Sequence, residues 1–140
     1  MKFGALLLMI LVVACDTTIP TPETTLWEGD LRPTAATMNG MHGQVAAVSR
    51  RVGTDVGIRV GGIERNAAHP WRLREGSCAN PGSVLGPPDN YPNLVQSGGM
   101  EVEAEAYVPP RLDAAGQYLV EVQSSTSDPT PVLCGDLTLL

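Results

Sequence analysis

The chain has 140 residues, with 4% aromatic residues, 12 prolines, 15 glycines and a net charge of −6. This length fits one domain and is too short for two, and the scarcity of aromatic residues means that the core must be aliphatic. The acidic balance disfavours nucleic acids and anionic lipids as partners, because their phosphates repel it. The abundance of proline and glycine favours short strands joined by turns over long helices.

Residues 1–14 have the form of a bacterial lipoprotein signal peptide. The apolar run at residues 3–13 is too short to cross a bilayer as a mature helix, and residues 12–15 read Val-Val-Ala-Cys, similar to a lipobox. We expect cleavage before Cys15 and lipid on its thiol. The alternatives are an ordinary signal peptide with a chance cysteine, or a short buried helix. Cleavage removes the only lysine, so Lys+Arg falls from 9 to 8 against 15 Asp+Glu and the net charge becomes −7.

Residues 15–25 form a Thr/Pro-rich tether that begins at the lipidated cysteine. Such a segment has no side chains to bury and is expected to be extended. We therefore expect acyl chains, and not a basic patch, to attach the protein to the membrane. Residues 26–140 then form the folded domain.

Eight short strands are predicted in this domain. They cover residues 26–31, 42–50, 55–60, 69–74, 94–95, 100–108, 118–123 and a part of 131–140. Val45 and Val48 differ in parity, which predicts a bulge or burial on both faces of the second strand. Gly98-Gly99 predicts a hairpin turn before the sixth strand. Eight strands with such turns predict an all-β Greek-key sandwich or flattened barrel.

Alternation along the strands predicts which side chains are buried. In the fourth strand Trp71 and Leu73 face in, Arg72 and Arg74 face out, and residues 75–77 break the strand. Residues 80–82 and 86–90 are predicted to be turns.

The sixth strand shows the strongest alternation in the chain. Its inward residues are Met100, Val102, Ala104, Ala106 and Val108, and its outward ones Glu101, Glu103 and Glu105. Three carboxylates on one face could indicate a calcium site, but calcium takes six to eight oxygens from converging loops. We therefore expect these glutamates to form a solvated face of the sheet. In the seventh strand Tyr118, Val120 and Val122 share one face, and Leu119, Glu121 and Gln123 share the other.

Several motifs, in this order, resemble the copper,zinc superoxide dismutase-like superfamily, in particular its bacterial secreted and lipoprotein relatives. They are Trp71, Glu75-Gly76-Ser77-Cys78, Tyr91-Pro92, Gly116-Gln117-Tyr118 and Cys134-Gly135-Asp136-Leu137. The resemblance covers residues 26–140. It implies the same eight-stranded Greek-key fold that the alternation predicts.

The resemblance also implies a copper site, and here the chain departs from the family. Arg72-Leu73-Arg74 stands where the family has His-x-His, Gln123 stands at the third copper histidine, and residues 76–93 contain no histidine for zinc or for the bridge. In the family fold these positions converge on one outward patch. Two guanidiniums there either bind an anion or a partner's carboxylate, or form ion pairs with Glu75 or Glu121.

The other two cysteines and the two histidines are the remaining candidates for metal ligands. With Cys15 lipidated, Cys78 and Cys134 are left to pair, and an exported domain favours a structural disulfide over a redox pair. Two cysteines without a CxxC motif or a His pair make a poor metal site. His42 and His69 lie on different predicted strands and are expected at the surface, because a transition-metal site needs three or four convergent ligands.

These observations predict a lipid-anchored protein of the bacterial cell envelope, periplasmic or on the outer surface. Its superoxide dismutase-like domain is expected to have no catalytic residue and no metal. We expect a binding or structural module for a protein or small-molecule partner, and not for nucleic acid. The alternative is a divergent copper,zinc superoxide dismutase or a copper-handling envelope protein.

Overall fold

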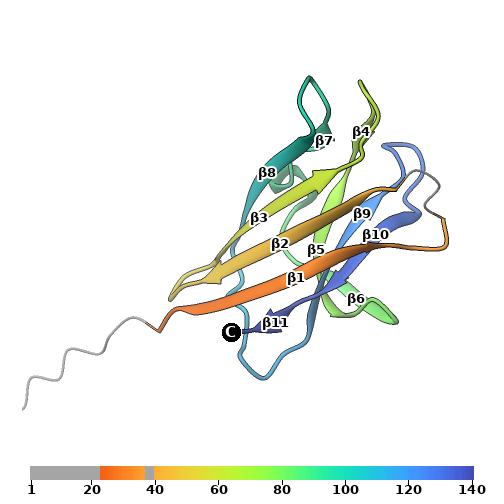
Figure 1. Cartoon of the computed structure of the whole chain (residues 1–140). Helices are drawn as coiled ribbons and strands as arrows, with labels where there is room; N and C mark the ends of the chain where they lie inside the picture. The colour runs from red at the N-terminus through yellow and green to blue at the C-terminus, as the bar shows by residue number, and fades with distance from the viewer. Residues whose placement is uncertain (1–22, 37–39) are drawn as a thin grey trace, which may run out of the picture.

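The computed structural model of the chain describes residues 23–36 and 40–140. They form a curled antiparallel sheet with one short 3-10 helix (Figure 1). The elements are β1 (Thr25–Pro33), β2 (His42–Ser49), β3 (Thr54–Gly61), β4 (Ala68–His69), β5 (Trp71–Ser77), β6 (Asn80–Val84), η1 (Pro88–Asn90), β7 (Leu94–Val95), β8 (Glu101–Val108), β9 (Tyr118–Gln123), β10 (Pro131–Asp136) and β11 (Thr138–Leu139). Among these described residues, no helix is long and apolar enough to cross a membrane.

The sheet runs in the order β6-β5-β9-β10-β1-β2-β3-β8, and β11 also pairs with β1. Hairpins join β1, β2 and β3, and β10 returns to lie beside β1, which is a Greek-key arrangement. Curling brings the half made of β6-β5-β9-β10 against the half made of β1-β2-β3-β8 (Figure 1). The predicted all-β fold is therefore confirmed.

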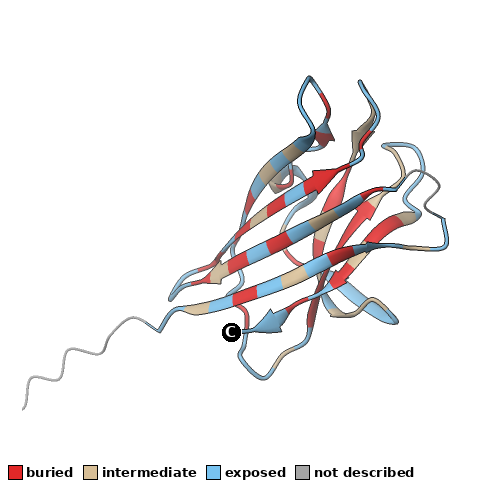
Figure 2. Ribbon diagram, viewed as in Figure 1, coloured by how far each residue is buried: buried red, intermediate tan, exposed pale blue. Residues whose placement is uncertain are grey.

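The core lies between the two halves and is filled by the inward rows of the longer strands, whereas β4, β6 and β11 add no buried residue (Figure 2). On β3, Val56, Ile58 and Val60 are buried while Asp55 and Arg59 are exposed, as the alternation predicts. Burial of these aliphatic side chains is the main driving force for folding.

Two edge-to-face aromatic pairs anchor the core. The Trp27 and Tyr118 rings have centroids 5.3 Å apart, and the Trp71 and Tyr91 rings 5.1 Å. Trp71 is fully buried, and its Nε1 donates a hydrogen bond to the Pro92 carbonyl at 2.8 Å. Each pair joins strands or loops that are far apart in the sequence, so few aromatic residues suffice for this core.

The predicted break at residues 75–77 is wrong, because β5 continues to Ser77 and forms a hairpin with β6. Gly76 has φ +95° and lies at an irregularity of the β5–β6 register, and a Cβ there would approach the Asn80 carbonyl oxygen to 2.5 Å. Residues 80–82 are therefore strand and not turn. Pro81 is tolerated because β6 is an edge strand, where its missing N–H costs no ladder bond.

Three smaller predictions about the strands are also wrong. β2 has no bulge, since its register is unbroken from His42 to Ser49. It is buried on one face, with Val45 inside and Val48 only half-buried. Gly98-Gly99 does not close a hairpin between β7 and β8, because β7 pairs with β4. Met100 precedes β8 and is 90% exposed instead of facing inward.

β9 differs from the other strands because both of its faces are buried. Tyr118, Val120 and Val122, which the alternation places on one face, point into the core, but Leu119 and Glu121 on the opposite face are also buried. A strand buried on both faces needs a cover on its outer side. That outer side carries the candidate functional site.

Candidate functional site

The candidate site is the outer face of β5, β9 and β10, here called the Glu121 face. In the register of the sheet, Arg72 lies opposite Glu121, and Glu121 lies opposite Cys134. Arg74 lies opposite Leu119, one step along the same face. The backbone register therefore places both predicted arginines and Cys134 on neighbouring positions around Glu121.

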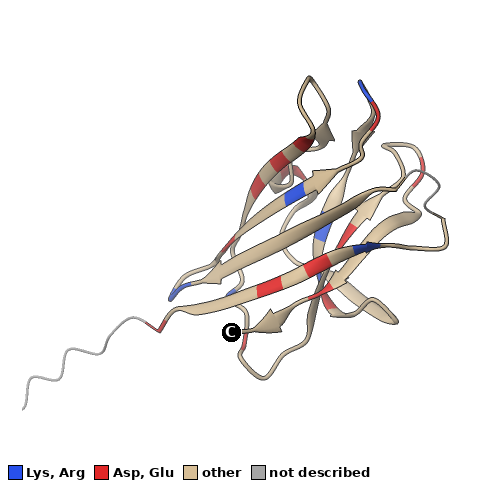
Figure 3. Cartoon of the chain, viewed as in Figure 1, with Lys and Arg blue, Asp and Glu red and all other residues tan. Residues whose placement is uncertain are grey.

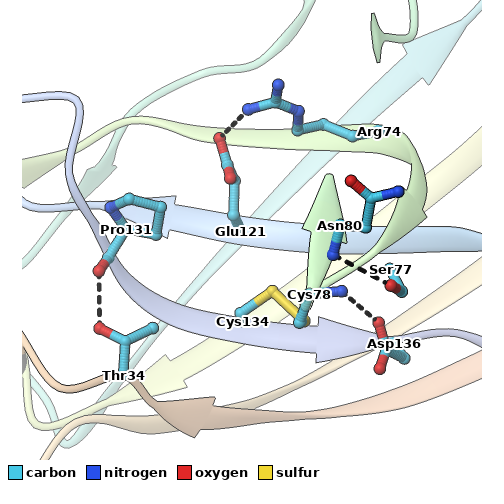
Figure 4. Close-up of a disulfide and its surroundings, with 9 residues drawn as sticks. All are labelled: Thr34, Arg74, Ser77, Cys78, Asn80, Glu121, Pro131, Cys134 and Asp136. Carbon is cyan, nitrogen blue, oxygen red and sulfur yellow. Dashed lines mark hydrogen bonds and ion pairs between the residues drawn. A yellow bond between two sulfur atoms is a disulfide. The ribbon is translucent and has the colours of Figure 1, made fainter. Parts of the chain in front are cut away.

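Arg74 and Glu121 form an ion pair at the centre of this face (Figure 4). The Arg74 Nη1 donates to Glu121 Oε1 at 2.9 Å, and the Arg74 Nε donates to the Gly82 carbonyl at 2.8 Å. The Glu121 side chain is only 3% exposed and that of Arg74 26%. The bond to Gly82 fixes the guanidinium between β9 and the edge strand β6, so Arg74 is committed to partners within the domain.

Arg72 turns away from Glu121 and contacts a different part of the domain. Its Nη1 donates to the Trp71 carbonyl at 2.6 Å, and its guanidinium carbon lies 5.4 Å from the centroid of the Tyr91 ring. Burial raises the pKa of the Tyr91 phenol to about 12, although a backbone hydrogen bond to Leu73 and the charge of Arg72 act in the opposite direction. The two arginines thus have separate partners and do not form one anion clamp.

Gln123 lies two residues beyond Glu121, near the end of β9. Its backbone N–H donates to the Pro70 carbonyl at 2.8 Å, and its own carbonyl oxygen lies 2.9 Å from Nδ1 of His69. The second histidine, His42, is on β2 in the other half of the sheet, where Nδ1 lies 3.2 Å from the Gly40 carbonyl oxygen. His69 lies on β4, which pairs with β7 as a separate two-stranded sheet, so the two histidines belong to different sheets, and only His69 lies beside a predicted site residue.

The residues at the implied copper positions do not fit copper. A guanidinium is protonated at every accessible pH and has no lone pair to donate. Within residues 23–36 and 40–140, no group of three or more His, Cys, Asp or Glu side chains could hold a metal ion. Arg72, Arg74 and Gln123 thus differ from the donor set that the resemblance implies.

Cys78 and Cys134 form the predicted disulfide, with Cα atoms 5.9 Å apart (Figure 4). It links the β5–β6 turn to β10 across β9, over a sequence separation of 56. The Cys78 N–H also donates to Asp136 Oδ1 at 2.7 Å. The bridge and this hydrogen bond hold the β5–β6 hairpin against β10 at the margin of the Glu121 face.

A pocket of about 300 Å³ lies beside the Glu121 carboxylate. Its wall on the β1 side is held by Thr34, whose Oγ1 donates to the Pro131 carbonyl at 2.6 Å (Figure 4). The pocket lining is mostly apolar and includes Ala36, Pro81, Leu119, Pro131 and the disulfide. Together these groups cover β9 and explain why Leu119 and Glu121 are buried on an outer face.

The other half of the sheet has an acidic outer face. Arg59 on β3 pairs with Glu103 at 2.8 Å and with Glu101 at 3.6 Å, and all three side chains are about half exposed or more. Figure 3 shows acidic residues along β8 and on β1. A broad hollow of about 1080 Å³ lies over this face, and Glu28 and Glu105 are among its lining residues. The predicted solvated carboxylates of β8 are thus partly paired across the strands.

The importance of Glu121 did not emerge from the sequence, where it is only a possible partner for an arginine. The signal that could have revealed it is Leu119, an apolar residue in the row predicted to face outward. With it, residues 118–122 form a run that is buried throughout, with a single charge inside. A carboxylate within such a run needs a buried partner.

Comparisons with known proteins do not assign this chain to a family. No known protein family, curated protein or solved structure matches the chain. Cys15 and the predicted signal peptide lie outside the described residues. The resemblance to superoxide dismutase-like proteins therefore stays a prediction.

Proposed function

We propose that the protein is a lipid-anchored component of the bacterial cell envelope whose superoxide dismutase-like domain is metal-free and non-catalytic. The domain serves as a binding or structural module. The observation that carries this proposal is the ion pair between Arg74 and Glu121, formed where the resemblance implies a copper ligand.

The chemistry of dismutation supports this reading. Copper must cycle between two oxidation states while it is held mainly by neutral imidazoles. Arg72 and Arg74 remove two such ligands and add two positive charges, each costing a nearby cation roughly 1 kcal/mol per unit charge at 4 Å even in bulk water. Arg74 is also engaged by Glu121 and Gly82 and is not free to turn away. The face is therefore built for internal packing and not for metal chemistry.

The export and anchoring part rests on the sequence at residues 1–25. A lipobox-like end at Cys15 and a Thr/Pro-rich tether favour a lipoprotein. The Cys78–Cys134 disulfide fits an oxidising compartment such as the periplasm or the cell surface. Mass spectrometry of the N-terminal peptide from native membranes tests this part, with an acylated Cys15 as the expected result. An unmodified N-terminus at another residue would exclude it.

Metal content and activity separate the main proposal from its rival, a divergent copper,zinc superoxide dismutase or copper-handling protein. The purified protein, incubated with copper and zinc and then desalted, is expected to keep neither metal stoichiometrically and to show no dismutase activity. One retained copper per chain, with dismutation above the rate of free metal, would support the rival.

A further inference from the structure

Exposed apolar side chains gather at one end of the sheet. Leu26 on β1 lies opposite Val48, Val48 opposite Asp55, and Asp55 opposite Tyr107 on β8, so one row crosses the half-sheet at this end. Leu26 and Tyr107, at the two ends of the row, are both exposed. Exposed apolar groups gathered in one place mark an interaction site more often than scattered ones.

Two neighbouring segments extend this row. The Leu140 N–H donates to the Leu26 carbonyl at 2.9 Å, which brings the exposed Leu139 and Leu140 beside β1. The ring of Tyr107 packs against Gly53 in the β2–β3 turn, next to Val52, which is 72% exposed. We call the resulting surface the tether-end rim; its members are Leu26, Val52, Tyr107, Leu139 and Leu140.

The rim lies where the folded domain receives its N-terminal segment. β1 begins at Thr25, beside the β2–β3 turn and close to the C-terminus (Figure 1). Thr25 is ten residues from Cys15. A fully extended chain of that length spans at most about 35 Å. An acylated Cys15 therefore keeps this end of the domain, more than any other, close to the bilayer surface.

The charges at this end differ from those of the whole chain. Arg50 pairs with Asp55 at 3.2 Å and Arg111 with Glu23 at 3.0 Å. Among the described residues Arg51 has no ion-pair partner, and it adjoins the exposed Val52 at the tip of the turn. The net charge of the chain predicts repulsion from anionic lipid, but the unpaired charge beside Val52 at this turn is an arginine, whereas the acidic Glu28 and Glu105 lie further along β1 and β8.

We propose that the tether-end rim rests on the phospholipid surface that holds the acyl chains of Cys15, with β4, β7 and Met100 facing away. This inference rests on the proposed lipid anchor. Apolar and tyrosine side chains are stabilised at the boundary between headgroups and acyl chains, and arginine extends to the phosphates. Because the tether makes the contact intramolecular, a weak affinity is enough to orient the domain.

Fluorophores at the two ends of the acylated protein test this orientation. Val52→Cys places the label on the rim, and Met100→Cys places it on a site at the opposite end that is at least as exposed. The native disulfide and the acyl group leave no other reactive thiol. On vesicles of phosphatidylcholine and phosphatidylglycerol with nitroxide-labelled lipid, the Val52→Cys label should be quenched several-fold more than the Met100→Cys label. Equal quenching at both sites overturns the proposal.

A second variant and a flotation assay separate the possible failures. Leu140→Asp in the Val52→Cys protein should reduce the quenching, whereas Val95→Asp, on β7, should leave it unchanged. An equal effect of the two substitutions also counts against the rim. Flotation with the vesicles tests the anchor itself. If the acylated protein does not float with the vesicles, both the lipid anchor and the membrane contact of the rim are disproved. If it floats but both labels are quenched equally, only the membrane contact of the rim is disproved.

Discussion

Nη1 of Arg74 and Oε1 of Glu121 lie 2.9 Å apart on a sheet face where the Glu121 side chain is 3% exposed. A carboxylate so far from water is stabilised by its partner, since removing that partner leaves a buried charge without compensation. The pair crosses from β5 to β9 beside the disulfide. Loss of either charge of this pair is therefore expected to destabilise the sheet.

Arg74→Ala should destabilise the domain by roughly 3–5 kcal/mol, because it leaves Glu121 buried and unpaired. Urea unfolding followed by circular dichroism measures this change. The double variant Arg74→Met with Glu121→Leu should recover most of the loss, since two apolar groups need no partner. Arg50→Ala is the matched control: it breaks the exposed pair with Asp55 and should cost at most about 1 kcal/mol. If Arg74→Ala costs no more than the control, the pair is not structurally important.

Much of this fold could be predicted because strands with one buried face alternate with a period of two. β3 and the outward glutamates of β8 follow that rule, and the structure confirms them. The hairpin of β5 with β6 could not be predicted, because a positive φ at Gly76 lets the pairing continue through residues typical of a turn. Local composition does not show whether an edge strand has a partner.

The candidate site was predictable only in part. The pairing of Cys78 with Cys134 was predicted from the cysteine count and the expected export, and the common face of Arg72 and Arg74 from their parity in the strand. The burial of Glu121 depends instead on groups distant in sequence, with Thr34 and Pro131 on one side and Pro81 on the other. Leu119 is the one signal within β9 of a covered outer face, but the groups that form the cover cannot be identified from β9 itself, so the burial of the carboxylate was not predicted.

Removing the disulfide with Cys78→Ser should lower the free energy of unfolding by about 4 kcal/mol, since the bridge closes a loop of 56 residues in the unfolded chain. Reduction of the wild-type protein should cost about the same amount. Denaturant unfolding with and without reductant compares the two directly. Alkylation of both thiols in the oxidised native protein, detected by mass, would contradict the bridge.

The phenol of Tyr91 should make the domain less stable at high pH. Burial raises its folded pKa to about 12, whereas an unfolded tyrosine titrates near pH ~10. Between these values the unfolded chain binds fewer protons, so this contribution is complete below pH ~10 and is lost as the pH rises toward ~12. Unfolding free energies measured over this range should fall, and Tyr91→Phe should remove that part of the decline. An unchanged slope in the variant would show that Tyr91 is not responsible.

Restoring histidines at the implied copper positions tests how the Glu121 face departs from the family it resembles. The triple variant Arg72→His, Arg74→His, Gln123→His supplies imidazole nitrogens on one strand pair and removes two positive charges. We expect measurable copper affinity by isothermal titration calorimetry, where the wild type shows none. Dismutase activity should not follow, because residues 76–93 contain no histidine for the zinc or the bridge.

In this variant the Glu121 carboxylate loses its partner Arg74 and could itself bind copper. The double variant Arg72→Gln, Arg74→Gln is the matched control, because it removes the same charges without supplying imidazoles. Copper affinity in the histidine variant alone assigns the gain to the new ligands, whereas equal affinity in both variants assigns it to the freed Glu121 carboxylate. If neither variant binds copper, the three positions do not converge as the resemblance implies, and Glu121, which lies directly opposite Arg72, becomes the better choice for the third histidine.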